Sequence, residues 1–263
     1  MTNPVIIGDA TLYLGDCRDI LPTIRCDHIL SDPPYEIEAH GSGRRLLGRS
    51  VELKDARVRE IEMVPLDFGP MAEDLRRHVC SWGGDSCRGW ILAFCQAEAI
   101  ATWRTAMEAG GVRWRRAMVW IKPDSSPQLS GDRPAQGFES IALGWCGSGA
   151  SRWNGGGRRG VFIFGKHDHG TGHGGRQNDH PTQKPVLLMR ELVALFSIAD
   201  DLIADPFMGS GTTGVAAIQL GRKFIGIEKE PKYFDIACER IENAQRQDTL
   251  FAEKHVLLQE SFL

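Results

Sequence analysis

The clearest indication of this chain's fold is the run Asp205-Pro206-Phe207-Met208-Gly209-Ser210-Gly211-Thr212-Thr213-Gly214. The run follows the short apolar stretch 202–204 and leads into a second apolar stretch at 215–220. This order predicts a strand, a tight loop and a helix. The glycines have the spacing G-x-G-x-x-G, which lets the backbone approach a ligand closely at the amino end of the helix. Because no Lys-Ser or Lys-Thr pair follows the glycines, the loop is not of the triphosphate-binding type.

An acidic residue, Glu228, directly follows the next predicted strand, Lys223–Ile227. In folds of this kind, a carboxylate at that position accepts hydrogen bonds from the hydroxyl groups of a ribose. The loop and the acid together predict a site for a nucleoside-containing ligand. A nicotinamide-dependent (NAD) dehydrogenase has the same two features and is the alternative from another class. Only 35 residues (263 − 228) follow Glu228, which is too short for the second half of a dinucleotide fold in its usual order.

A second unusual turn, Asp32-Pro33-Pro34-Tyr35, follows the predicted strand His28–Ser31 near the start of the chain. The prolines fix φ and remove two N–H donors, so the turn is rigid and rich in hydrogen-bond acceptors. The carboxylate of Asp32 and the carbonyl of Pro33 are able to accept the protons of an NH2 group on a flat heterocycle. The ring of Tyr35 is placed to stack on the same heterocycle. Taken alone, the turn is equally compatible with a proline turn that only closes a strand.

These two motifs, in this order, resemble the amino-methyltransferases of DNA, which use S-adenosylmethionine (SAM) to methylate the exocyclic amine of adenine or cytosine. The order resembles the permuted β group, in which the catalytic motif comes first and the cofactor loop last. Two further stretches are similar to that group, namely Leu14-Gly15-Asp16-Cys17 and His180-Pro181-Thr182-Gln183-Lys184-Pro185. The resemblance extends from about Thr11 to Arg240 and so covers most of the chain.

The resemblance implies an α/β, Rossmann-like SAM-dependent methyltransferase fold with a mostly parallel sheet, helices on both faces and DNA-recognition insertions. It implies catalytic roles for Asp32, Pro33, Pro34 and Tyr35. It places Asp16 near the cofactor adenine, and Thr182 and Lys184 at the cofactor carboxylate. The full set that the resemblance implies for cofactor binding is Asp16, Asp32, His180, Thr182, Lys184, Asp205, Pro206, Phe207, Gly209, Ser210, Gly211, Thr212, Thr213 and Glu228.

Alternating apolar stretches along the 263 residues favour one α/β domain. Periodicity predicts strands at Thr11–Leu14, His28–Ser31, Trp90–Phe94, Val112–Ile121, Glu139–Trp145 and Val161–Phe164, besides those that flank the glycine loop. It predicts helices at Met71–Cys80, Gln96–Ala109, Pro185–Ser197 and Tyr233–Gln245. The alternation is typical of a mostly parallel sheet covered by helices.

Two stretches without periodicity, at about 36–68 and 124–179, are the predicted target-recognition insertions. The net charge of −3 excludes a globally basic protein, so a DNA-binding surface has to be local. The basic residues predicted to contact DNA are Arg44, Arg45, Arg152, Arg158, Arg159, Lys166 and Arg176. The competing interpretation is solvated loops with ordinary surface charge. The expected partner is double-stranded DNA with a flipped target base; a homodimer is left open.

The seven cysteines form no C-x-x-C pair, which argues against a disulfide framework or a zinc ribbon and favours a cytoplasmic protein with reduced thiols. The four clustered histidines have no standard zinc spacing, so no metal is predicted at His167, His169, His173 or His180. No apolar stretch is long enough to span a membrane, and the N-terminus lacks the features of a signal peptide.

The tetrad also bears on the target base. In the family that the chain resembles, an aspartate at the first position goes mostly with adenine and a serine mostly with cytosine. Asp32 therefore favours adenine N6, and cytosine N4 is the alternative. The resemblance implies a site-specific DNA-methylating enzyme of the restriction–modification kind and leaves open whether a cognate nuclease accompanies it.

Overall fold

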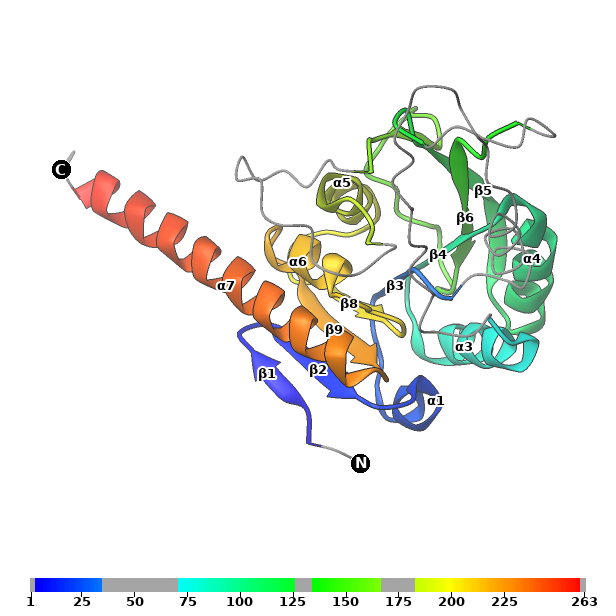
Figure 1. Cartoon of the computed structure of the whole chain (residues 1–263), viewed down its shortest axis with the longest axis horizontal. Coiled ribbons are helices and arrows are strands. Elements are labelled where there is room, and N and C mark those ends of the chain that lie inside the picture. Colours follow the sequence, from blue (N-terminus) through cyan, green and yellow to red (C-terminus); the bar gives the residue numbers. More distant parts are fainter. Residues whose placement is uncertain (1–2, 35–70, 126–133, 167–182, 261–263) are drawn as a thin grey trace, which may run out of the picture.

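The computed structural model describes residues 3–34, 71–125, 134–166 and 183–260, with side chains up to residue 247. The described residues form a nine-stranded sheet with helices on both faces (Figure 1). The strands are β1 (Val5–Ile7), β2 (Ala10–Leu14), β3 (His28–Ser31), β4 (Trp90–Cys95), β5 (Arg113–Ile121), β6 (Phe138–Trp145), β7 (Val161–Ile163), β8 (Leu202–Asp205) and β9 (Lys223–Glu228). The helices are α1 (Cys17–Ile20), η1 (Leu21–Thr23), α3 (Glu73–Ser86), η2 (Ala97–Ala99), α4 (Ile100–Ala109), α5 (Val186–Phe196), α6 (Thr212–Ile218) and α7 (Pro231–Glu260).

The strand order is β1-β2-β9-β8-β3-β4-β6-β5-β7. The five neighbours from β2 to β4 are mutually parallel, whereas β1 and β6 run antiparallel to their neighbours, so the predicted mostly parallel sheet is confirmed. From β8 the chain continues through α6 to β9 on one side, while the next strand after β3 is β4 on the other side. The boundary between β8 and β3 is therefore a topological switch point, where open α/β sheets bind ligands beyond the carboxyl ends of their strands.

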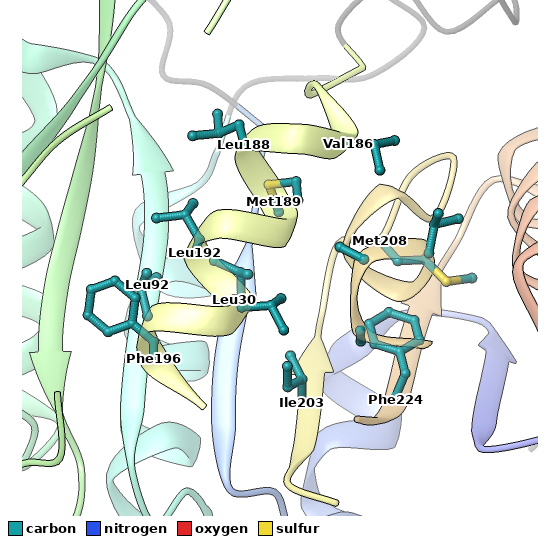
Figure 2. Packing of buried hydrophobic residues seen from close by; sticks show 14 of the residues in the cluster. Leu30, Leu92, Val186, Leu188, Met189, Leu192, Phe196, Ile203, Met208 and Phe224 are labelled. Atoms are coloured by element: carbon teal, nitrogen blue, oxygen red, sulfur yellow. The ribbon is translucent and has the colours of Figure 1, made fainter. Parts of the chain in front are cut away.

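Apolar side chains from the central strands alternate between two cores, because successive residues of a strand point to opposite faces. On one face, Leu30 and Leu92 pack with Leu192 of α5, an arrangement visible in Figure 2. On the other face, Ile29 and Ile91 pack against residues of α1, α3 and α4. Parallel strands require helices on both faces of the sheet. A ligand site is therefore left to the ends of the strands, and the row of their carboxyl ends is called the carboxyl edge below.

The predicted elements are largely confirmed, and the main differences concern β1, α3, α4 and α7. The helix predicted at Met71–Cys80 begins at Glu73 and continues to Ser86. The strand β1 was not predicted, since it is only three residues long. The helix predicted at Gln96–Ala109 begins with the 3-10 turn η2 and becomes α-helical at Ile100. The last helix runs over Pro231–Glu260, beyond the predicted end at Gln245, because neither glycine nor proline interrupts it after Pro231. Figure 1 shows α7 extending away from the sheet toward the C-terminus. Across the described ranges, no helix has the combination of length and apolarity needed to cross a membrane.

Candidate active site

The two predicted motifs lie next to each other at the carboxyl edge of the sheet. Strands β3 and β8 are paired in register, with His28 opposite Ile203. At the ends of these strands, the hydroxyl of Ser31 donates a hydrogen bond of 2.6 Å to Oδ1 of Asp205. The turn that begins at Asp32 and the glycine loop that begins after Asp205 therefore start next to each other, at the ends of adjacent strands.

Asp205 fixes the shape of the glycine loop. Its side chain is buried, its Oδ2 accepts a hydrogen bond from Thr213 Oγ1 at 2.6 Å, and its Oδ1 also accepts one from Phe207 N at 3.1 Å. Burial raises the pKa of Asp205 to about 6, while the hydrogen bonds from Ser31 and Thr213 oppose the shift. Both oxygens are engaged by protein donors, so Asp205 holds the loop in shape.

The loop requires glycine at two positions, because Gly209 and Gly211 have φ of 51° and 79°, in the left-handed region. A Cβ added at Gly211 would lie 2.9 Å from the Cβ of Ala237 in α7. Gly211 also precedes the first turn of α6, which begins at Thr212. The loop thus lies close against α7 at Gly211, where there is no room for a side chain.

Arg240 of α7 holds the loop from behind, a role that the sequence analysis did not predict. Its Nη1 donates to the carbonyl and the hydroxyl of Ser210, at 2.5 and 2.9 Å, and to Thr212 Oγ1 at 3.1 Å. Burial lowers the pKa of Arg240 to about 10. A single arginine within a predicted helix does not reveal such a contact in the sequence.

Two further predicted acids lie at the same edge, at the ends of β9 and β2. Glu228 Oε2 accepts a hydrogen bond from Gly209 N at 2.9 Å, and burial raises the pKa of Glu228. Leu14 pairs with Glu228 in the register of β2 and β9, which brings Asp16 to the neighbouring position. Asp16 caps α1 and pairs with Arg18 at 2.6 Å, and this hydrogen bond lowers the pKa of Asp16 to about 2.

Lys184 lies beside Asp32. Its Nζ is 2.6 Å from Oδ2 of Asp32 and 3.3 Å from Oε2 of Glu139, and its side chain is only 5% exposed. The resemblance implied a place for Lys184 at the cofactor carboxylate, whereas the structure places its ammonium between two protein carboxylates. Although burial disfavours the charged form, Asp32 and Glu139 raise the pKa of Lys184. Lys184 is therefore an ion-pair partner of Asp32 and Glu139.

The other oxygen of Asp32 is unpaired. Oδ1 is a buried atom that has no hydrogen-bond partner among the described residues. Burial raises the pKa of Asp32 to about 6, Lys184 opposes this shift, and Glu139 adds to it. An unsatisfied carboxylate oxygen beside the glycine loop is suited to accept a hydrogen bond from an N–H group of a ligand.

The predicted DNA contacts that the structure describes lie at different edges of the sheet. Lys166 follows β7 at the carboxyl edge, and its backbone N–H donates to the carboxylate of Asp124 at 2.7 Å. Arg152, by contrast, lies at the opposite ends of the strands. Its carbonyl accepts a hydrogen bond from the indole of Trp90, the first residue of β4, so Arg152 lies at the amino edge.

Arg158 and Arg159 precede β7 and are exposed. Arg158 pairs with Glu191 of α5. Several predicted site residues lie outside the described residues: Tyr35, Arg44, Arg45, Arg176, His180 and Thr182. The other histidines weighed as metal ligands, His167, His169 and His173, also lie outside them. In the part of the chain that the structure describes, no group of histidine, cysteine and acidic side chains is arranged to hold a metal ion.

The fold is the Rossmann-like α/β fold of SAM-dependent methyltransferases. The crystal structure of the M1.HpyAVI–SAM complex has a TM-score of 0.64 at 23% identity and covers 88% of this chain and 98% of that one. The cytosine-N4-specific PvuII DNA methyltransferase has a TM-score of 0.65 at 14% identity and covers 89% of this chain and 86% of that one.

The sequence comparisons agree over the C-terminal part of the chain. A family model described as DNA methylase matches residues 149–239. The type II methyltransferase M2.DpnII of Streptococcus pneumoniae is 52% identical over 63 residues, which are 24% of this chain and 24% of that protein. The match thus spans about a quarter of the length of this curated relative. The predicted resemblance to the DNA amino-methyltransferases is confirmed by these comparisons.

Proposed function

We propose that this protein is a site-specific DNA methyltransferase that transfers a methyl group from SAM to the exocyclic N6 of adenine. The observation that carries the proposal is the buried Oδ1 of Asp32, unpaired among the described residues, at the start of the tetrad and beside the glycine loop. The matches to DNA methylases support the reaction class. The SAM complex of M1.HpyAVI, on the same fold, supports the choice of cofactor.

The residues at the carboxyl edge fit SAM. Glu228 has only part of its acceptor capacity engaged by backbone N–H groups, so it is able to accept from the ribose hydroxyls. The loop between Asp205 and Thr213 would hold the methionine part, and Asp16 would lie near the adenine. When bound, SAM supplies a methyl group that is activated by its attachment to a positively charged sulfur.

Asp32 and Pro33 would prepare the target amine for reaction. The lone pair of an adenine amine is delocalised into the ring, which makes it a poor nucleophile. Hydrogen bonds from its two N–H groups to Asp32 Oδ1 and the Pro33 carbonyl favour a pyramidal nitrogen whose lone pair is available. The new N–C bond forms as the S–C bond breaks, and the resulting cationic amine then loses a proton to Asp32 or to water. Alignment is the main contribution of the protein, because the leaving group is already activated.

Adenine is favoured over cytosine because an aspartate stands first in the tetrad. The PvuII enzyme, which shares the fold, is cytosine-N4-specific by name, so cytosine N4 is the second candidate. In either case the base has to leave the duplex to reach Asp32, and Tyr35 would provide a stacking surface. Among the residues predicted to contact DNA, Lys166 is one that the structure describes at the edge where such DNA would enter.

The test is to incubate the purified protein with isotope-labelled SAM and unmethylated plasmid DNA, digest the DNA to nucleosides and analyse these by mass spectrometry. We expect labelled N6-methyldeoxyadenosine, and none with Asp32→Ala. Labelled N4-methyldeoxycytidine alone would move the target to cytosine. Thermal stabilisation by NAD and not by SAM, with no label in DNA, would replace the proposal with the dehydrogenase alternative.

A further inference from the structure

Behind Asp32 lies a row of four alternating charges, which we call the charge row: Asp32, Lys184, Glu139 and Lys122. The contacts are 2.6 Å from Asp32 to Lys184, 3.3 Å from Lys184 to Glu139 and 2.9 Å from Glu139 to Lys122. Two carboxylates and two ammonium groups give the row no net charge. Two of these residues belong to motifs found in the sequence. Asp32 opens the tetrad, and Lys184 was expected at the cofactor carboxylate.

The charge row is a costly way to fill a protein interior. The side chains of Lys184, Glu139 and Lys122 are 5%, 12% and 14% exposed, and the ammonium of Lys184 lies 5.1 Å from the ring centre of Phe94. Removing such charges from water costs several kcal/mol each, and an apolar replacement of similar volume is often neutral or stabilising. Stability is therefore a weak explanation for the row, which points to a role in the chemistry.

The geometry shows what the charge row does to Asp32. Lys184 donates a hydrogen bond to Oδ2 of Asp32, whereas Oδ1 has no partner among the described residues. Lys184 is held in turn by Glu139, which lies on β6, and Glu139 is held by Lys122, which directly follows β5. Because β5 and β6 are paired strands of the sheet, the orientation of Asp32 is fixed to a rigid base outside both sequence motifs.

We propose that Glu139 and Lys122 are positioning residues for methyl transfer, and that they act through Lys184 to keep Asp32 Oδ1 facing the target amine. This inference rests on the proposed function, because it assigns these residues to the same reaction.

The charge row also sets the electrostatic surroundings of Asp32. The charged groups that face it among the described residues are Lys184, Lys122, Glu139 and Asp205. The two lysines favour the carboxylate, and the two acids oppose it. Burial raises the pKa of Asp32 to about 6 within this balance, so Asp32 is ionised at neutral pH and still able to take up a proton after transfer.

The test compares Glu139→Gln with Lys122→Gln, using the pH dependence of single-turnover methyl transfer to DNA at saturating SAM. Removing the negative charge of Glu139 lowers the pKa of Asp32, so the acidic limb of the profile should move to lower pH. Removing the positive charge of Lys122 raises that pKa, so the limb should move to higher pH. The plateau rates should fall roughly ten- to a hundredfold as Asp32 loses its alignment. The Kd for SAM should stay within about twofold of wild type, and Lys122→Arg should restore the wild-type limb.

A merely structural role for these residues predicts different results. The inference would be overturned if the acidic limbs of the two variants stayed in place or moved in the same direction, and if the loss of rate only followed a lower melting temperature. If Glu139→Gln does not fold, the pair Lys122→Gln and Lys122→Arg decides by the same criterion. If the wild type transfers methyl groups but the acidic limbs of the variants do not move, the positioning role of the charge row is refuted and the proposed function is not. An absence of transfer by the wild type refutes the proposed function, and with it the role of the row.

Discussion

The glycine loop offers a quantitative test of how the site is built, through the substitution Gly211→Ala. Gly211 has φ of 79° and packs against α7. A side chain in this left-handed region costs about 1–2 kcal/mol. The added Cβ would also meet Ala237 at 2.9 Å, and overpacking of this kind costs about 1–3 kcal/mol. The expected loss in the free energy of unfolding is therefore about 2–5 kcal/mol.

Gly111 provides the matched control. Its φ of 80° is nearly the same, but a Cβ added there would meet nothing within 4 Å. Gly111→Ala should therefore lose only the backbone contribution of about 1–2 kcal/mol and should leave SAM binding unchanged. Gly211→Ala should also weaken SAM binding, because the loop has to move away from α7.

The measurement is urea unfolding of both variants, followed by isothermal titration with SAM at a temperature where each is folded. The difference between the two free energies isolates the contact with Ala237 from the backbone strain. Equal losses for the two variants, or wild-type SAM affinity in a destabilised Gly211→Ala protein, would refute the reasoning about close packing of the loop.

Three further predictions concern the chemistry and the DNA surface. Asp32→Ala should abolish methyl transfer and keep most of the SAM affinity, whereas Glu228→Ala should weaken SAM binding; near wild-type transfer by Asp32→Ala would contradict the assigned role, and filter binding with labelled SAM separates the two variants. Methyl transfer by the wild type should decline as pH falls through about 6, because the raised pKa of Asp32 means that it gains a proton there and loses acceptor capacity; a rate–pH profile that is flat between pH 5 and 8 would contradict this. Lys166→Ala should weaken DNA binding and reduce the slope of log affinity against log salt by about 1, whereas Arg152→Ala at the opposite edge should leave both unchanged; a salt series by fluorescence anisotropy would reveal the reverse order if the DNA lies at the amino edge.

The parts of the site that the sequence predicted are those encoded locally. A strand that ends in Asp32-Pro33-Pro34, or in a glycine loop after Asp205, carries its geometry in consecutive residues, so strand ends and loop conformation follow from composition. The alternation of strands and helices predicted a mostly parallel sheet. The adjacency of β3 and β8 was not predicted, because four strands separate them in the sequence.

The charge row could not be predicted in this way. Glu139 and Lys122 approach each other because β5 and β6 pair antiparallel at the far side of the sheet, with Ile121 opposite Phe138. That pairing depends on the chain reversing direction through a segment without periodicity. The position of Arg152 was likewise not encoded locally, because it depends on β6 running antiparallel to β4. Strand β6 therefore ends at the amino edge, with Trp145 opposite Trp90, and Arg152 follows there.

The hydrogen bond from Ser31 to Asp205 joins residues that are 174 positions apart in the sequence. The proposed chemistry requires that the ends of β3 and β8 lie side by side. The sheet places them so, whichever of the two strands comes first in the sequence. The order of the two motifs along the chain can therefore differ without a change in the arrangement of the site. A chain that began at the glycine loop and ended after the proline turn would bring the same two strand ends together, provided that its strands paired in the same order.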